Sequence, residues 1–96
     1  MVTLIATLQI KPGKMEEAIE VLKEMATNIK SSESGTLEYI PHTVKGEGLE
    51  NTIIFYEKYE SEEALKFHSK NLRKTAVNLA PLLAPGRDIK TCLEIK

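Results

Sequence analysis

Residues 2–30 read VTLIATLQIKPGKMEEAIEVLKEMATNIK, and the period of the apolar residues changes within this stretch. In residues 2–10 every second residue is apolar, and this alternation, with several β-branched side chains, is typical of a strand. Pro12-Gly13 then interrupts the pattern. From residue 14 to residue 30 the apolar side chains recur at three- and four-residue spacing, which predicts an amphipathic helix. The chain therefore begins with a strand followed directly by a helix.

The remaining sequence predicts three more strands and a second helical region. We expect strands at 36–44, 52–59 and 89–95, and a helical region from Ser61 to about Leu83 with a break near 69–71. Pro41 lacks an N–H group, which indicates an edge strand or a bulge. The glycine-containing segment 45–48 predicts a hairpin connection, and Pro85-Gly86 predicts the end of the second helical region.

The predicted order, β-α-β-β-α-β, is that of a ferredoxin-like α+β domain. We expect a single domain spanning residues 1–96, with an antiparallel four-stranded sheet and both helices on one face. The first and third strands also carry apolar residues on the opposite face, namely Ile5, Ile54 and Tyr56. A sheet with one solvated face alternates more cleanly between apolar and polar residues. The simplest partner for this apolar outer face is the same face of a second copy, packed sheet to sheet in a homodimer.

Composition excludes several classes of function. Thirteen Lys and Arg residues against fourteen Asp and Glu residues give a formal net charge of -1, so no nucleic-acid partner is expected. Cys92 is the single cysteine, which excludes an internal disulfide and a cysteine-rich metal site and favours a cytoplasmic setting and a packing role. The first residues predict neither a signal peptide nor a membrane span.

No strong catalytic motif is present. The sequence has no glycine-rich phosphate loop, no CxxC and no HExxH. What remains is a polar and aromatic set: Tyr39, His42, Tyr56, Glu57, Tyr59, His68 and Asn71. Each of these residues also has a structural interpretation. The tyrosines are typical of half-buried strand positions, and His42 is typical of an exposed position near a hairpin. Glu57 is expected to form a cross-strand or dimer-contact pair, and Asn71 to cap or break a helix. His68 stands out because it lies next to the predicted helix break, so catalytic and structural roles are balanced for it.

Two segments resemble a known family. Residues 33–42, ESGTLEYIPH, are similar to the E-x-G-x-L-x-Y-x-x-H stretch of antibiotic biosynthesis monooxygenase (ABM) domains. Residues 56–68, YEKYESEEALKFH, resemble the family's Y-E-x-[WY]-x-[ST/D]-x-x-A-x-x-x-H pattern. The family includes cofactor-independent quinol and polyketide oxygenases, haem-degrading enzymes and an isomerase of a phosphorylated sugar. The resemblance implies a homodimer in which two ferredoxin-like sheets form a dimeric α+β barrel.

The resemblance also implies roles for individual residues. Many relatives have Trp where this chain has Tyr59, and many have a second His a few residues after His68, where the segment 69–73 has none. We therefore expect a monooxygenase that uses no haem, other cofactor or metal and acts on a small aromatic or quinol-like compound. The expected catalytic residues are His68, as base or hydrogen-bond partner, and Tyr56, and the expected substrate-binding residues are Tyr39, Tyr59, Asn71 and His42.

Two other functions remain open at this point. One is the isomerisation of a small phosphorylated metabolite by the same acid–base groups, with Lys70, Arg73 or Lys74 binding the phosphate. The other is a non-catalytic dimeric module that binds a ligand or acts in a stress response. Oxygen consumption with quinols would distinguish the monooxygenase from both, and ligand-induced thermal stabilisation without turnover would favour the binding module.

Overall fold

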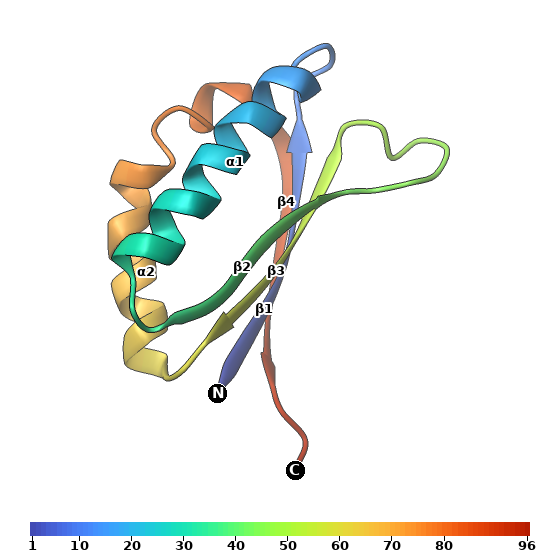
Figure 1. Ribbon diagram of the computed structural model, residues 1–96. Helices are drawn as coiled ribbons and strands as arrows, with labels where there is room; N and C mark the ends of the chain where they lie inside the picture. The colour runs from blue at the N-terminus through green and yellow to red at the C-terminus, as the bar shows by residue number, and fades with distance from the viewer.

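A computed structural model describes residues 1–96 and shows a four-stranded sheet with two helices on one face (Figure 1). In chain order the elements are β1 (Val2–Ile10), α1 (Met15–Ser32), β2 (Thr36–Thr43), β3 (Thr52–Tyr59), α2 (Glu62–Thr75), the short 3-10 helix η1 (Ala80–Leu82) and β4 (Leu83–Leu93). The strand order is β2-β3-β1-β4, and all neighbouring strands are antiparallel. The predicted ferredoxin-like α+β fold is confirmed.

Both helices form where local signals favour them. The buried residues of α1 are Ala18, Leu22, Met25 and Ile29, whose four- and three-residue spacing places them on one stripe against the sheet. Ser61 caps α2, because its hydroxyl oxygen accepts a hydrogen bond from the backbone N–H of Ala64 at 3.1 Å. Each helix has two glutamates in its first turn, where they stabilise the positive end of the helix dipole.

The predicted break in the second helix near 69–71 is wrong. Helix α2 continues to Thr75, and the chain then turns into η1. His68 and Leu72 lie four residues apart on the helix and both line the cavity described below, so packing along one stripe holds the helix together through this polar stretch. The side chain of Asn71 does not cap a helix end, because its amide donates to a carboxylate outside the helix.

The last strand begins earlier than predicted. Strand β4 starts at Leu83 instead of residue 89, and Pro85-Gly86 lies inside it. The pairing with β1 shifts register between Thr7 and Gln9, and this irregularity accommodates the proline and a glycine with φ of 113°. Proline is tolerated because β4 is an edge strand. Pro41 also lies in an edge strand, β2, as predicted.

The two faces of the sheet have different surroundings. Leu4 and Ala6 of β1 and Phe55 of β3 are buried beneath the helices. The residues that alternate with them along each strand point to the outer face of the sheet, away from the helices. The helix-covered face holds the main core, an eleven-residue cluster that includes Leu22, Met25, Tyr39 and Phe55. Neither helix is long and apolar enough to cross a membrane.

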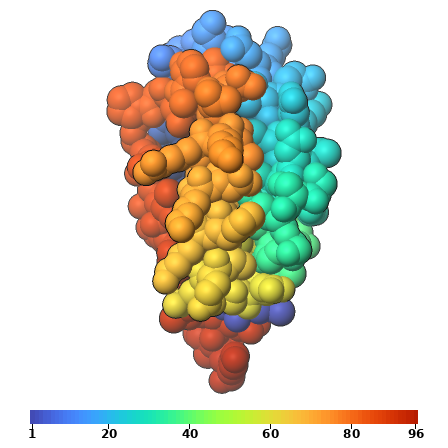
Figure 2. Space-filling model, turned by 90° about the vertical axis from the view of Figure 1, so that its left-hand side faces the viewer, coloured from blue at the N-terminus to red at the C-terminus, as the bar shows by residue number.

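The helical side of the molecule shows how the layers are arranged (Figure 2). Helix α2 (yellow to orange) lies beside α1 (cyan to green), and the C-terminal residues (red) project at one end. Strand β4 runs along the other side of α2, where the surface is hollowed between the two elements. This hollow leads to the candidate active site.

Candidate active site

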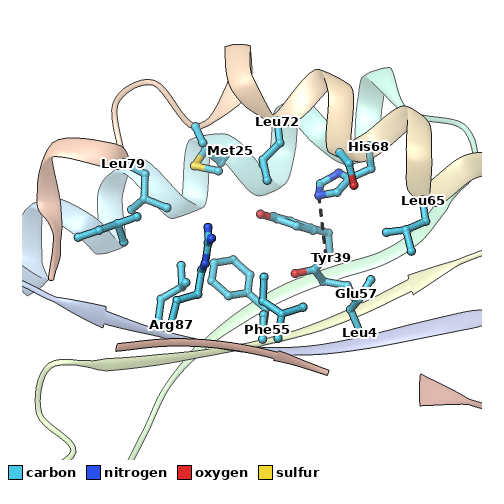
Figure 3. Close-up of a pocket in the computed structure, with 16 residues that line it drawn as sticks. Leu4, Met25, Tyr39, Phe55, Glu57, Leu65, His68, Leu72, Leu79 and Arg87 are labelled. Atoms are coloured by element: carbon cyan, nitrogen blue, oxygen red, sulfur yellow. Dashed lines mark ion pairs between the residues drawn. The ribbon is translucent and has the colours of Figure 1, made fainter. Parts of the chain in front are cut away.

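A cavity of about 190 Å³ lies between α2 and the helix-covered face of the sheet (Figure 3). It is lined by residues from every strand and both helices: Leu4, Ala6, Leu8, Met25, Tyr39, Phe55, Glu57, Leu65, His68, Ser69, Leu72, Ala76, Leu79, Leu83, Arg87 and Ile89. Twelve of these sixteen residues are hydrophobic. An engineered apolar cavity of about 150 Å³ binds benzene. The space therefore suits one substituted aromatic ring.

His68 forms part of the α2 wall of this cavity and is buried. Its Nδ1 lies 2.8 Å from Oε1 of Glu33, a residue that directly follows α1. Burial by itself raises the pKa of Glu33, but hydrogen bonds from Asn71, Thr36 and His68 outweigh it and hold this pKa below its ordinary value. The ionised carboxylate can only accept, so we assign the proton to Nδ1 of His68. Nε2 is then the basic nitrogen.

The close approach of two chain segments brings Glu33 to His68. A Cβ atom on Gly35 would lie 2.6 Å from Cβ of Ala64 in α2, a contact that folded proteins do not tolerate. Glycine therefore allows the segment before β2 to contact α2 directly. Thr36 Oγ1 donates to Glu33 Oε1 at 2.8 Å, and Asn71 Nδ2 donates to Glu33 Oε2 at 2.8 Å. Both carboxylate oxygens are thus satisfied inside the protein.

Glu57 lies on the other side of the imidazole. It is buried on β3, and its Oε1 is 3.9 Å from His68 Nε2 and 2.5 Å from Tyr59 Oη, which donates to it. Burial raises the pKa of Glu57, and the hydrogen bond from Tyr59 and the charge that the imidazole of His68 carries when it is protonated only partly offset this effect. The cross-strand side-chain pair expected for Glu57 is not observed, because its hydrogen bond is to Tyr59, two residues along the same strand and on the same face. The alternative, a dimer contact, stays a prediction.

Two tyrosine rings hold the imidazole between them. The ring centroids of Tyr39 and Tyr59 lie 5.3 Å and 5.2 Å from that of His68. Burial, together with nearby carboxylates, raises the pKa of both tyrosines, so both hydroxyls stay protonated and can donate. Tyr59 is fully buried, whereas Tyr39 lines the cavity. The Tyr39 hydroxyl makes no hydrogen bond to the protein and points into the cavity (Figure 3), where it is free to bind a ligand.

The other predicted site residues lie elsewhere. Tyr56 pairs with Ile5 and Ile40 on the outer face of the sheet, because it alternates with Phe55 and Glu57 along β3; its predicted proximity to His68 is not observed. His42 is exposed on β2, with Nδ1 3.2 Å from the carbonyl oxygen of Ile54. Asn71 does not line the cavity and instead holds Glu33.

The cations expected to bind a phosphate also lie outside the cavity. Lys70, Arg73 and Lys74 are exposed on α2 and do not line it. The one cationic side chain in the wall is Arg87 of β4, which points into the cavity and has no carboxylate partner (Figure 3). Sequence reasoning missed this residue because it placed Arg87 between elements. It also missed Glu33, although the quoted motif begins with that residue.

The chain matches a model of a known protein family. A family model described as antibiotic biosynthesis monooxygenase matches residues 1–76. The chain belongs to the ABM family. This ABM protein is 33% identical over 70 residues to "Putative monooxygenase YcnE" of Bacillus subtilis (strain 168), covering 73% of this chain and 70% of the relative. The ABM resemblance predicted from the two sequence segments is confirmed.

Solved structures support the same assignment. A crystal structure named as that of a putative antibiotic biosynthesis monooxygenase from Caulobacter crescentus CB15 has a TM-score of 0.85 at 25% identity, over 99% of this chain and 90% of that one. The structure of PA3566 from Pseudomonas aeruginosa has a TM-score of 0.77 at 26% identity, over 99% and 94%. Together with the family match, the Bacillus and Caulobacter relatives, which are both named as monooxygenases, support a monooxygenase-like function for the ABM protein.

The ABM protein has no evident metal centre. No three His, Cys, Asp or Glu side chains are grouped so that they could hold a metal ion. Cys92 is half-buried on β4, opposite Thr3, and does not line the cavity. The polar groups that face the cavity or hold the imidazole include the two carboxylates and the Tyr39 hydroxyl.

Proposed function

We propose that this ABM protein is a cofactor-independent monooxygenase that acts on a small aromatic or quinol-like compound. The observation that carries the proposal is the arrangement of His68. Its Nδ1 is held by the ionised Glu33 at 2.8 Å, and the ring lines an apolar cavity of about 190 Å³. A buried imidazole with a fixed proton on one nitrogen has the other nitrogen free as a general base.

The chemistry of oxygen explains why such a base is useful. Ground-state O₂ is a triplet and reacts slowly with closed-shell molecules, so without a cofactor the substrate itself supplies electrons, as a phenolate or an enolate. His68 removes the proton, and the free hydroxyl of Tyr39 donates a hydrogen bond to the resulting oxyanion. One oxygen atom enters the substrate, and the other leaves as water with two hydrogens from the substrate. The apolar walls exclude solvent during this step.

Arg87 supports the same proposal electrostatically. A guanidinium without a carboxylate partner attracts an anionic ligand, and its charge stabilises a substrate that loses a proton in the cavity. We therefore include Arg87 with Tyr39 among the residues that hold the substrate anion. Asn71 and Tyr59 act indirectly, through Glu33 and Glu57.

Oxygen uptake tests the proposal directly. Protein treated with a chelator is mixed anaerobically with a panel of quinols and hydroxynaphthalenes, and ¹⁸O₂ is then admitted. We expect catalysed oxygen consumption and one ¹⁸O atom per product molecule, with no requirement for added metal, flavin or haem. Turnover that appears only after a cofactor is restored, or a complete absence of oxygen uptake with substrates that bind, would contradict it.

A homodimer is part of the proposal. The outer face of the sheet carries Ile5, Ile54 and Tyr56, all half-buried in the single chain, and Ile40, which is 38% exposed. Packing this face on a second copy removes these side chains from water. Sedimentation equilibrium is expected to give a dimer at micromolar concentration, and Ile54→Asp is expected to give monomers. A wild-type monomer at that concentration would contradict this assignment.

A further inference from the structure

Arg87 of β4 carries a charge that has no partner in the protein. Its side chain points into the cavity (Figure 3), and none of the ion pairs of the chain includes it. The neighbouring carboxylate, Asp88, pairs instead with Lys90 at 2.9 Å. Arg87 and Ile89 line the cavity, whereas Asp88 between them does not, because successive strand residues point to opposite faces of the sheet. The charge of Arg87 is therefore available to a ligand.

An irregularity of β4 places Arg87 at this point of the wall. In the pairing of β4 with β1, the three residues 85–87 lie opposite the single residue Leu8. Gly86, in the middle of the three, has a φ of 113°, and a Cβ atom there would lie 3.2 Å from Cγ of Gln9. Bulges re-aim side chains and are frequent next to active sites. This departure from regular pairing ends at the residue that carries the free charge.

The acid–base groups of the cavity lie together at one end of it. Glu57 of β3 lies opposite Tyr39 of β2 and opposite Leu4 of β1 in the register of the sheet. His68 covers this row of side chains from α2. Its ring centroid is 5.3 Å from that of Tyr39, and its Nε2 is 3.9 Å from Glu57 Oε1. The proton transfer of the proposed function therefore belongs to this row.

Arg87 lies two rows of cavity-facing side chains further along the sheet. The row between is apolar and consists of Ala6, Phe55 and Ile89. Arg87 follows at the level of Leu8, four residues after Leu4 on β1, which corresponds to about 13 Å of strand at about 3.3 Å per residue. The base and the cation thus stand at different ends of the cavity, with an apolar middle between them.

We propose that Arg87 binds a carboxylate of the substrate, so that the site takes aromatic hydroxy acids in preference to neutral quinols. The assignment deepens the proposed function and rests on it. His68 deprotonates the hydroxyl group at one end, the ring lies against the apolar middle row, and Arg87 holds the carboxylate at the other end. A guanidinium group matches a carboxylate with two parallel hydrogen bonds.

The charges of the site favour a carboxylate over a phosphate. Arg87 is the only Lys or Arg side chain in the wall, and Glu57 lines the same cavity. A carboxylate carries one negative charge, which one guanidinium balances, whereas a phosphate monoester carries about two near pH 7. The further cations that a phosphate would need, on α2, lie outside the cavity. The substrate is therefore a monoanion before His68 removes its proton.

Binding of acids and their amides tests this assignment. 4-Hydroxybenzoate and 4-hydroxycinnamate are each compared with the corresponding amide, which has nearly the same shape and no charge. Anaerobic isothermal titration calorimetry at pH 7 is expected to show at least one acid bound about tenfold more tightly than its amide. This is the effect of one charge-assisted hydrogen bond at the lower end of its range, because Arg87 is exposed at the mouth of the cavity. Equal binding of acid and amide in both pairs would overturn the proposal.

Arg87→Gln is the decisive variant, because glutamine keeps a polar side chain and removes the charge. It is expected to lose the preference for acids and to bind the amides within twofold of the wild-type protein. The matched control is Arg73→Gln, the same change at the chain's other arginine, which is exposed on α2 outside the cavity and is expected to leave the preference intact. A preference that survives Arg87→Gln, or that Arg73→Gln also removes, would overturn the proposal.

Gly86→Ala tests the bulge without changing any charge. Alanine is strained at a φ of 113°, so Arg87 is expected to be displaced and the preference for acids to fall severalfold. Circular dichroism confirms that each variant is folded. An unchanged preference in a folded Gly86→Ala variant would contradict the placement of Arg87 by the bulge.

Oxygen uptake separates this inference from the proposed function. The titrations are anaerobic and need no turnover, so they report on binding alone. A preference for acids without oxygen uptake contradicts the monooxygenase alone. Oxygen uptake with equal affinities for acids and amides contradicts the role of Arg87 alone.

Discussion

The two carboxylates on either side of His68 have similar burial but opposite electrostatic character. Glu33 is 2% exposed and Glu57 is 7% exposed. Glu33 accepts hydrogen bonds from three side chains, and its pKa is below the ordinary value, whereas Glu57 accepts from one side chain, and its pKa is above it. Burial penalises both charges, so the number of donors decides whether the pKa falls or rises. The imidazole thus lies between a carboxyl group that ionises more readily than an ordinary glutamate and one that ionises less readily.

Removing the imidazole leaves the two carboxyl groups without the base that lies between them, and this change is expected to have the largest effect on turnover. His68→Ala is expected to lower turnover by about 10²–10⁴, the usual contribution of a general base, because neither carboxylate replaces Nε2. Steady-state oxygen uptake measures this loss. The matched control is His42→Ala, which changes the chain's other histidine at an exposed position, and turnover within twofold of the wild-type value is expected there. Full activity of His68→Ala would leave His68 with a structural role.

Removing the carboxylate of Glu33 is expected to destabilise the fold. Glu33→Ala leaves His68 Nδ1, the Asn71 amide and the Thr36 hydroxyl without their acceptor, and a buried donor left without a partner costs about 1–3 kcal/mol. Urea unfolding measures the change. Glu24→Ala removes an exposed glutamate from the middle of α1, and a change within about 0.5 kcal/mol is expected. Similar values for the two variants would show that the Glu33 network contributes nothing to stability.

A smaller effect is expected when the approach of Glu33 to α2 is obstructed. Gly35→Ala places a Cβ atom 2.6 Å from Cβ of Ala64, and such overpacking costs about 1–3 kcal/mol. The double variant Gly35→Ala/Ala64→Gly removes the clash, so the two changes are expected to be less than additive in urea unfolding. Strict additivity would mean that the two segments do not touch in solution.

The smallest expected effect is on the pH dependence of the free energy of unfolding, to which Glu33 and Glu57 contribute with opposite signs. Glu33 has a lowered pKa, so its contribution to stability is present above the ordinary value of 4.5 and is lost as the pH falls through the lowered pKa. Glu57 has a raised pKa, so its contribution is present below 4.5 and is lost as the pH rises through the raised pKa. Each contributes at most about 1.4 kcal/mol per pH unit.

Chemical denaturation of single variants separates the two contributions. The stability difference between wild type and Glu33→Gln is expected to shrink as the pH is lowered from 5 to 3. The difference between wild type and Glu57→Gln is expected to move in favour of the variant as the pH is raised from 5 to 8. Parallel pH dependences for both variants would remove the distinction between the two carboxylates.

The sequence predicts the parts of this fold that depend on local patterns. Strand β1 and helix α1 follow from the change of apolar period at Pro12-Gly13, and the cap at Ser61 follows from its neighbours. The start of β4 does not, because Pro85-Gly86 is accommodated by irregular pairing with β1, nearly eighty residues earlier in the chain. Local composition at that point indicates a turn, and only the partner strand overrides it.

The site was predictable in part, for a physical reason. His68 and Tyr39 were identified, and they lie together at the cavity. The sequence pattern predicts Tyr56 as a site residue, but its neighbour Glu57 lines the cavity instead. Strand β3 is apolar on both faces, so the pattern does not reveal which face the helices cover. The role of Glu33 depends on a contact with His68 across 35 residues, which no local pattern encodes.

The contact at Gly35 has a consequence for the order of folding. The bonds from Glu33 to α2 join residues 35 and 38 positions apart in the chain, and they need α1, the start of β2 and α2 to be docked together. A partly folded state that has its helices but lacks this docking contains every site residue and no oriented imidazole. Contacts between segments far apart in the chain cost more loop-closure entropy than the local contacts of a helix. Protection of the His68 Nδ1–H proton from exchange therefore reports that these three segments have docked, and the imidazole is oriented for catalysis only after that step.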